Sequence, residues 1–316
     1  MRNRTSRIRI ILGGLLFLII GVTYAQQTQN DSFQIQKAYQ KLTKVWETQP
    51  VFKTPESVVY DANHDVLYVS NFNVRGGFVS RGDTTADEFI SKVHLNGEIE
   101  ELKWVTGLLN PCGMAIYHDT LYVVERRRLA AIDIESGTIV SRYDIPGSLF
   151  PNDIIFDCKG TGYITDNNNN ATTSIFKYEQ GRCTPWISSE VIFKPNGIDC
   201  VGNRILVGDA RDKSLKFIEL ATQEISPVAS FQDASGRAMF DGLQVMKNGG
   251  LLTSFWDGPG FWITKSGNIY EIIDTQTIDR PNVNDADWLY LDDQQLLIIP
   301  TFFDNRLMAF HLKCDE

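Results

Sequence analysis

Apolar and polar residues alternate along most of the chain in short runs that are typical of β-strands. The runs come in pairs, an apolar segment, a polar turn and a second apolar segment, with Gly, Asn and Asp at the turns. The second segments are Val66–Ser70, Leu121–Val124, Gly162–Thr165, Ile205–Val207, Leu251–Phe255 and Leu296–Ile299. The sequence lacks helical periodicity, so the pattern predicts an all-β protein.

A short phrase opens each pair and turns the pattern into a repeat. Its copies are Pro55-Glu56-Ser57, Pro111-Cys112-Gly113, Pro151-Asn152-Asp153, Pro195-Asn196-Gly197, Phe240-Asp241-Gly242 and a degenerate Asn284-Asp285-Ala286. Copies stand about 40 to 56 residues apart, a period typical of propeller blades with four strands each. Six copies predict a single six-bladed β-propeller.

The two ends of the chain are expected to meet in the last blade. The C-terminal repeat supplies only three strands, whereas residues 41–47, which include Trp46, have the pattern of one more strand. Pairing this N-terminal strand with the last repeat would complete blade six and close the ring without an open edge. The propeller is therefore predicted to span residues 41–316, with a long loop at 257–266 near the channel mouth.

The first 25 residues have the pattern of a secretory signal peptide. Four Arg precede the apolar run 10–22, and Thr23-Tyr24-Ala25 is a suitable cleavage site. An uncleaved membrane anchor is the alternative, although the apolar run is short for a membrane span. Residues 26–40 are polar and are predicted to form a flexible tether. The sequence thus predicts a periplasmic or secreted protein with no stable membrane insertion after cleavage.

Charge and cysteine content narrow the function classes. The net charge is −9, and removal of the four Arg of the leader takes it to about −13, which argues against a nucleic-acid partner. The five cysteines form no CxxC pair, so structural thiols or one incidental disulfide are expected. The sequence contains no phosphate-binding GxxxxGK[ST] loop.

The middle letter of the repeated phrase carries the candidate chemistry. Four of the first five copies place an oxygen donor there: Glu56, Asn152, Asn196 and Asp241. A propeller brings one repeated position from every blade to the same end of its channel, so these side chains are predicted to converge on a metal. Oxygen ligands with two carboxylates suit Ca²⁺ first, then Mg²⁺ or Mn²⁺, and are unlike a structural zinc site. The alternative is that these Asn and Asp residues merely cap turns.

Other residues near the predicted mouth are candidates for substrate binding, or else ordinary rim residues. They are Asp153 beside Asn152, Arg126, Asp166 and Asp209 at the ends of second strands, Phe150, and Trp256. Phe150 and the aromatic set Phe255, Trp256, Phe261 and Trp262 indicate a partly apolar substrate. The four histidines fall in turns on the opposite face or in outer strands, which disfavours a serine–histidine hydrolase.

These motifs resemble the gluconolactonase and senescence-marker-protein (regucalcin) family of six-bladed propellers, with a more distant likeness to paraoxonases. The resemblance rests on Thr54-Pro55-Glu56 and on the three phrases that contain Asn152, Asn196 and Asp241, in family order. It implies that Glu56, Asn152, Asn196 and Asp241 bind a divalent metal, usually calcium, zinc or magnesium. It also implies that Asp241 serves as the catalytic residue in lactone hydrolysis.

The chain departs from the family at two points. Sugar-lactone members often carry an Arg two residues before the first Asn, where this chain has Phe150. The catalytic histidines of paraoxonases have no counterpart. The leading hypothesis is an exported metal-dependent lactonase or esterase with a small-molecule substrate, in which Asp241 assists proton transfer. The alternatives are a non-catalytic binding propeller with a structural calcium and a chemistry resembling strictosidine synthase. Oligomeric state and substrate identity are not predicted.

Overall fold

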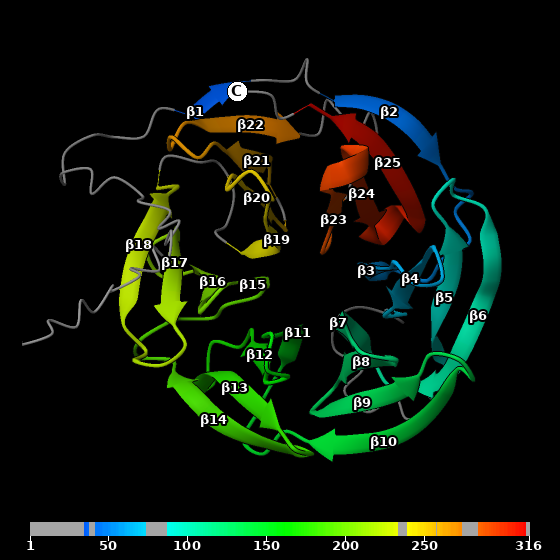
Figure 1. Cartoon of the computed structure of the whole chain (residues 1–316), viewed down its shortest axis with the longest axis horizontal. Helices are drawn as coiled ribbons and strands as arrows, with labels where there is room; N and C mark the ends of the chain where they lie inside the picture. The colour runs from blue at the N-terminus through cyan, green and yellow to red at the C-terminus, as the bar shows by residue number, and fades with distance from the viewer. Residues whose placement is uncertain are drawn as a thin grey trace, which may run out of the picture.

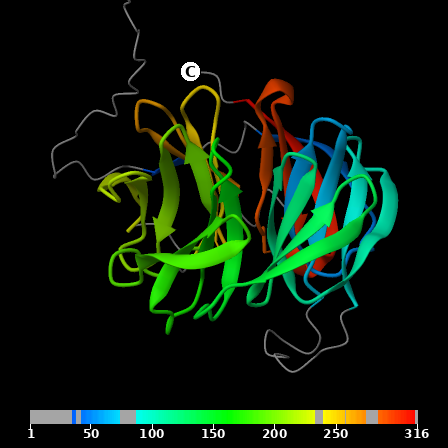
Figure 2. The same ribbon diagram turned by 60° about the horizontal axis from the view of Figure 1, so that its bottom comes forward.

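Six sheets stand radially around a central channel, as Figure 1 shows in a view down the ring. Figure 2, turned by 60°, shows the same ring as a disc whose inner strands run between its two faces. The computed structural model describes residues 35–37, 42–73, 87–232, 239–256, 258–273 and 284–313. This arrangement confirms the predicted six-bladed propeller of four-stranded antiparallel blades.

The first three blades follow the predicted strand pattern closely. Blade one comprises β3 (Pro55–Asp61), β4 (Val66–Asn71), β5 (Glu88–His94) and β6 (Ile99–Leu108). Blade two comprises β7 (Pro111–Tyr117), β8 (Thr120–Glu125), β9 (Arg128–Asp133) and β10 (Thr138–Asp144). Blade three comprises β11 (Pro151–Phe156), β12 (Gly162–Asp166), β13 (Thr173–Glu179) and β14 (Arg182–Ser188). In each blade the first strand lines the channel and the fourth lies at the outer edge (Figure 1).

The last three blades complete the ring with one addition. Blade four comprises β15 (Ile198–Val201), β16 (Arg204–Asp209), β17 (Ser214–Glu219) and β18 (Ile225–Ser230). Blade five comprises β19 (Phe240–Val245), β20 (Leu251–Phe255), β21 (Gly260–Ile263) and β22 (Ile269–Ile273). Blade six comprises β23 (Leu289–Leu291), β24 (Leu296–Thr301), β25 (Arg306–Leu312) and β2 (Leu42–Glu47). The addition is β1 (Ile35–Lys37), which pairs in parallel with β22.

The N-terminal strand closes the ring as predicted. β2 pairs antiparallel with β25, from Leu42 opposite Leu312 to Glu47 opposite Met308. Trp46 fixes this strand onto blade one, because its indole Nε1 donates a hydrogen bond to the Leu95 carbonyl at 2.9 Å. Its ring also covers Gly97, where φ is +87° and a Cβ would lie 2.8 Å from the indole. Trp46 therefore packs between blades, as the sequence indicated.

A separate hydrophobic cluster fills each interface between neighbouring blades. Val, Ile, Leu and Phe from the inner strands dominate these clusters, since both faces of a blade are covered by its neighbours. The four described cysteines, Cys112, Cys158, Cys183 and Cys200, are unpaired thiols, while Cys314 lies outside the described residues. The core of the molecule is thus a ring of six apolar layers.

The structure corrects the sequence prediction in blade five. The predicted loop at 257–266 contains β21, whose side chains are all buried. Phe261 and Trp262 belong to the clusters that join blade five to blades four and six, and Phe255 is likewise buried in the former. Residues 269–273 are consequently the fourth strand of the blade.

The N-terminal predictions fall largely outside the described residues. The signal peptide (1–25) and the tether (26–40) do so except for 35–37, which form β1. Within the described ranges, the protein has no helix with the length and apolar character needed to span a membrane.

Candidate functional site

A β-bulge turns the repeated position toward the channel. Pro55 pairs with Asn71 and Val58 with Val69, so Glu56 and Ser57 together face Ser70. The same shift occurs after Pro111, Pro151 and Phe240. A hydroxyl on the second strand fills three of these bulges: Ser70 accepts from the Ser57 amide (2.9 Å), Thr165 from Asp153 (3.1 Å) and Ser254 from Gly242 (3.0 Å). A bulge re-aims the side chain that precedes it.

The structure brings the four predicted metal ligands together. Glu56, Asn152, Asn196 and Asp241 are all buried, and they come from blades one, three, four and five. The Asn152 amide lies 3.4 Å from Glu56 Oε1, and the Asn196 side chain forms a hydrogen bond with the Asp241 carboxylate. Charge and hydrogen bonding thus couple residues that lie up to 185 positions apart (241 − 56).

The two remaining blades place apolar residues at the same ring position. Cys112 occupies it in blade two. In blade six, the bridge between Asp285 and Thr301 matches the pairing of Pro55 with Asn71, so Ala286 corresponds to Glu56. The ring therefore reads Glu, Cys, Asn, Asn, Asp and Ala from blade one to blade six.

Several side-chain oxygens at this ring position lack a hydrogen-bond partner, and a cation would supply one. Among the described residues, Glu56 Oε2, Asn196 Oδ1 and Asp241 Oδ1 are buried and have no hydrogen-bond partner. Buried polar atoms are normally paired, and unpaired oxygens that converge fit a hard divalent cation. In the described part of the chain, no three His, Cys, Asp or Glu side chains form a metal-binding group. A cation at this position would consequently depend on the two Asn oxygens as well.

Electrostatics point the same way. Burial, followed by the negative charges of Asp241 and Asp287, holds the pKa of Glu56 well above its usual range. Burial, followed by the charges of Asp287 and Asp285, does the same to the pKa of Asp241. Neither carboxylate forms an ion pair with any described Lys, Arg or His. A bound divalent cation would favour the charged form of both.

Sequence reasoning missed two carboxylates in the sixth blade, the buried Asp285 and the half-buried Asp287. Burial raises the pKa of Asp285 to about 8 and that of Asp287 to about 7. Asp285 Oδ2 has no hydrogen-bond partner among the described residues, whereas Asp287 Oδ2 accepts a hydrogen bond from Ser57 Oγ at 2.8 Å. The signal was present in Asp285-Ala286-Asp287, where two acids flank the apolar ring residue.

Asp153, predicted to bind substrate, is bonded to the protein backbone. Its Oδ1 accepts from the Ile154 amide at 2.7 Å, and its Oδ2 accepts from the Ile198 amide at 3.1 Å. It thereby ties blade three to blade four, just below Asn152 and Asn196. It also packs against Gly113, where a Cβ would come within 2.2 Å of Asp153 Oδ1.

The polar ends of the second strands hold the backbone that leads into the ring. Asp166 accepts from the amides of Leu149 (2.7 Å) and Phe150 (3.0 Å), which lie three and two residues before Asn152. Arg126 is half-buried and its Nε donates to Asn110 Oδ1 at 3.4 Å. Asp166 and Arg126 therefore contact the segments that support the ring.

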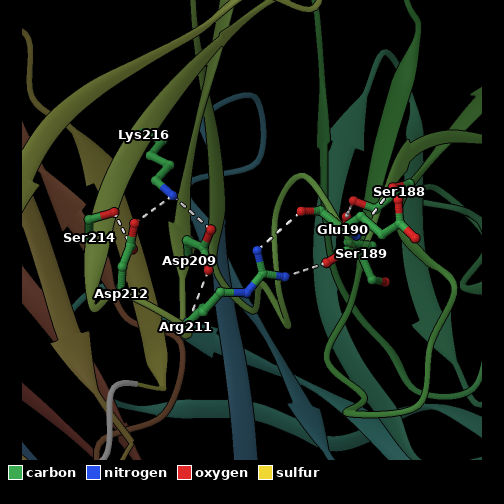
Figure 3. Close-up of polar contacts among 9 residues, drawn as sticks. Ser188, Ser189, Glu190, Asp209, Arg211, Asp212, Ser214 and Lys216 are labelled. Atoms are coloured by element: carbon green, nitrogen blue, oxygen red, sulfur yellow. Dashed lines mark hydrogen bonds and ion pairs between the residues drawn. The ribbon is translucent and has the colours of Figure 1, made fainter.

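Figure 3 shows the corresponding network in blade four. Asp209 accepts from the Arg211 amide at 2.9 Å and from Lys216 Nζ at 2.8 Å, and Lys216 also pairs with Asp212 at 2.8 Å. The Arg211 guanidinium turns away toward blade three, where it donates to the carbonyls of Ser189 (2.7 Å) and Glu190 (3.1 Å). Both oxygens of Asp209 are thus engaged within the protein.

Phe150 and Trp256 lie half-buried against a seventh hydrophobic cluster at the channel mouth. Its buried members are Phe72, Cys112, Ala286 and Phe302. Of the aromatic residues proposed from the sequence, these two remain near the ring.

Comparisons with known proteins add a likeness of fold. No family model matches the chain, and no curated protein matches its sequence. Among solved structures, the fold resembles one described as a "putative gluconolactonase", with a TM-score of 0.63 and 16% sequence identity. The match covers 86% of this chain and 92% of that protein. It confirms that the chain shares its fold with a protein so described.

Proposed function

We propose that the protein is a metal-dependent hydrolase that opens a lactone or a related ester at the channel mouth. The observation that carries the proposal is the set of buried, unpartnered oxygens on Glu56, Asn196 and Asp241. The likeness of fold to a protein described as a gluconolactonase supports the same reaction class.

Glu56, Asn152, Asn196 and Asp241 would hold the cation. The donor set of two carboxylates and two amides fits Ca²⁺ best, with Mg²⁺, Mn²⁺ or Zn²⁺ as further candidates. When bound, such a cation polarises a carbonyl oxygen and acidifies a coordinated water.

The protein's own groups would orient the reaction. The Asn196 side chain, hydrogen-bonded to Asp241, restrains the carboxylate. Asp241 is the proposed general base: its buried Oδ1 has no hydrogen-bond partner among the described residues, and burial, followed by the charge of Asp287, holds its pKa well above the usual range. Asp166 and Asp153 would hold the backbone around Asn152 through hydrogen bonds from the amides of Phe150 and Ile198.

Export is a second part of the proposal. The basic and apolar run of residues 1–25 supports translocation to a periplasmic or extracellular location. A small-molecule substrate from that compartment would reach the channel mouth without a protein partner.

The test is hydrolysis of a panel of sugar and acyl lactones by the protein from residue 26 onward, first with Ca²⁺ and then with a chelator. We expect turnover that chelation removes and that Asp241→Ala abolishes, while Asp119→Ala, at an exposed turn, leaves it unchanged.

The competing function is a non-catalytic propeller that binds a ligand around a structural ion. The contact between Asn152 and Glu56 favours it, since the ring residues also satisfy one another. Absence of turnover combined with a large loss of thermal stability on chelation would decide for this alternative.

A further inference from the structure

A repeated backbone contact builds the rim of the channel mouth. In five blades the residue after the second strand donates its amide to the residue that leads into the first strand. These bonds are Phe72 to Thr54 (3.1 Å), Asn167 to Phe150 (2.9 Å), Ala210 to Phe193 (3.0 Å), Trp256 to Met239 (2.9 Å) and Phe302 to Asn284 (2.9 Å). Each pair carries one aromatic residue. We name Phe72, Phe150, Phe193, Trp256 and Phe302 the aromatic rim.

The aromatic rim contacts the ring of residues that contains Glu56, Asn152, Asn196 and Asp241 on the side of blades two and six. Cys112 and Ala286, the two ring residues without an oxygen donor, are buried in the same cluster as Phe72 and Phe302. They lie in blades two and six, on either side of Glu56 in blade one. At the ring position itself, the oxygen donors of blades three to five thus form an oxygen-rich arc, and Cys112 and Ala286 form an apolar arc that flanks Glu56, with Asp285 and Asp287 next to Ala286 in sequence.

Two members of the rim present apolar surface in a fixed orientation. Trp256 packs edge-on against Phe302, with ring centroids 4.8 Å apart, and its carbonyl accepts from Asn284 Nδ2 at 2.7 Å. Phe150 is held through its amide by Asp166. Both are only half-buried. Rigid, partly exposed aromatic rings next to a reactive centre are well suited to bind an apolar group, since little conformational entropy is lost.

The polar residues near the mouth are less suited to grip a sugar. Asp166 and Asp209 accept hydrogen bonds from the protein with both carboxylate oxygens. A polyhydroxylated substrate needs a partner for each hydroxyl that it buries, because an unmet hydrogen bond is costly. Of the aromatic rim, Phe150 and Trp256 offer partly exposed ring surface where such partners would be required.

We infer that the site takes a lactone or ester with an apolar acyl chain or ring, and that the aromatic rim, chiefly Phe150 and Trp256, selects it over sugar lactones. The inference rests on the proposed function and names its substrate class. The carbonyl lies at the oxygen-rich arc and the apolar group lies across the arc beside Glu56.

The experiment compares γ- and δ-lactones of increasing alkyl length with gluconolactone, using the Ca²⁺-loaded protein. We expect kcat/KM to rise by up to about fourfold for each added methylene and gluconolactone to be the poorest substrate. Trp256→Leu should lower kcat/KM for a ten-carbon lactone by about 10-fold and change that of the shortest lactone by less than about twofold. Trp186→Leu, a half-buried Trp that packs on Tyr163 at the outer edge of blade three, is the matched control.

A second measurement separates this inference from the proposed function. Binding of 2-alkylcyclopentanones, which resemble the lactones but cannot be hydrolysed, is followed by calorimetry with and without Ca²⁺. Affinity that grows with chain length and is reduced by Trp256→Leu alone supports the rim, even for a protein without turnover. Turnover with no dependence on chain length, or with gluconolactone preferred, would overturn substrate selection by the aromatic rim but would still support the proposed hydrolase activity. A protein that neither hydrolyses lactones nor binds the ketones overturns both.

Discussion

At the scale of single residues, the candidate site is a group of carboxyl side chains that the fold largely shields from solvent. Glu56, Asp241 and Asp285 are buried and Asp287 is half-buried, and the pKa of each carboxyl is raised, with burial as the largest cause. Such groups destabilise a protein unless they are protonated or bound to a cation. Under the proposed function, the site residues would lower the stability of the empty protein and would provide affinity for a cation.

Replacing Glu56 by Gln should separate these two effects. The variant loses a buried carboxylate that faces Asp241, so the chelated protein is expected to unfold at a higher temperature than the chelated wild type. Ca²⁺ at about 100-fold over its dissociation constant should stabilise the wild type by about 2.7 kcal/mol, and the variant by much less. Calorimetric melting with and without Ca²⁺ checks both. A metal-free variant less stable than the metal-free wild type would contradict the prediction.

Asp285 gives the metal-free protein a pH dependence. Its pKa is about 8 in the folded protein against about 4 in an unfolded chain, so the folded state holds the extra proton between these values. Stability should therefore fall as pH rises from about 4 to 8. Asp285→Asn should reduce this fall by about 2 kcal/mol, a value discounted for relaxation of the buried group. Urea unfolding at pH 5 and pH 8 measures the difference, with Asp119→Asn as an exposed control.

At the scale of elements, the sequence predicted the features that repeat in each blade and missed those that occur in one blade only. The phrase that contains Glu56 recurs every 40 to 56 residues, so the blade number and the ring position of the first five blades could be predicted, whereas in blade six the structure places Ala286 there instead of Asp285. β21 breaks the pattern, because its Phe261 and Trp262 follow a Gly-Pro-Gly turn and resemble an exposed aromatic loop. The partners of Asp166 were equally hidden, since a polar residue at a strand end can face the channel or bind neighbouring backbone.

The contact between blades three and four offers a test at this scale. Thr165 Oγ1 accepts from the Asp153 amide and donates to the Asn196 carbonyl at 2.6 Å, so one hydroxyl aligns both Asn-bearing segments. Thr165→Val keeps the shape and removes both bonds. We expect a loss of about 1–3 kcal/mol in unfolding free energy and weaker Ca²⁺ binding. Thr161→Val, whose hydroxyl bonds the exposed Glu179, should change neither quantity.

At the scale of the whole molecule, closure of the ring holds the site together. The ring residues come from separate blades, and none of their neighbours in sequence could fix the distances between them. Blade six borders blade one, which carries Glu56, and β2 completes blade six. The pairing of β2 with β25 is therefore expected to influence the positions of Glu56, Asn152, Asn196 and Asp241, even though this pair lies at the outer edge of the disc (Figure 1).

Truncation from the N-terminus should show a sharp limit. A chain that begins at residue 34 retains β1 and β2 and is expected to unfold cooperatively like the protein from residue 26. A chain that begins at residue 48 lacks β2 and exposes the edge of β25, so it should lose cooperative unfolding and aggregate. Cooperative melting of the shorter chain at the same temperature would show that closure is dispensable.

The same pairing sets the timing of folding during synthesis. Leu42 of β2 pairs with Leu312, so the outer strand of blade six cannot pair until nearly the whole chain has been made. Contacts between residues so distant in sequence form late and slowly. The unclosed chain is therefore expected to persist until translation ends, which leaves it open to chaperones and available for passage through a membrane channel as an unfolded thread.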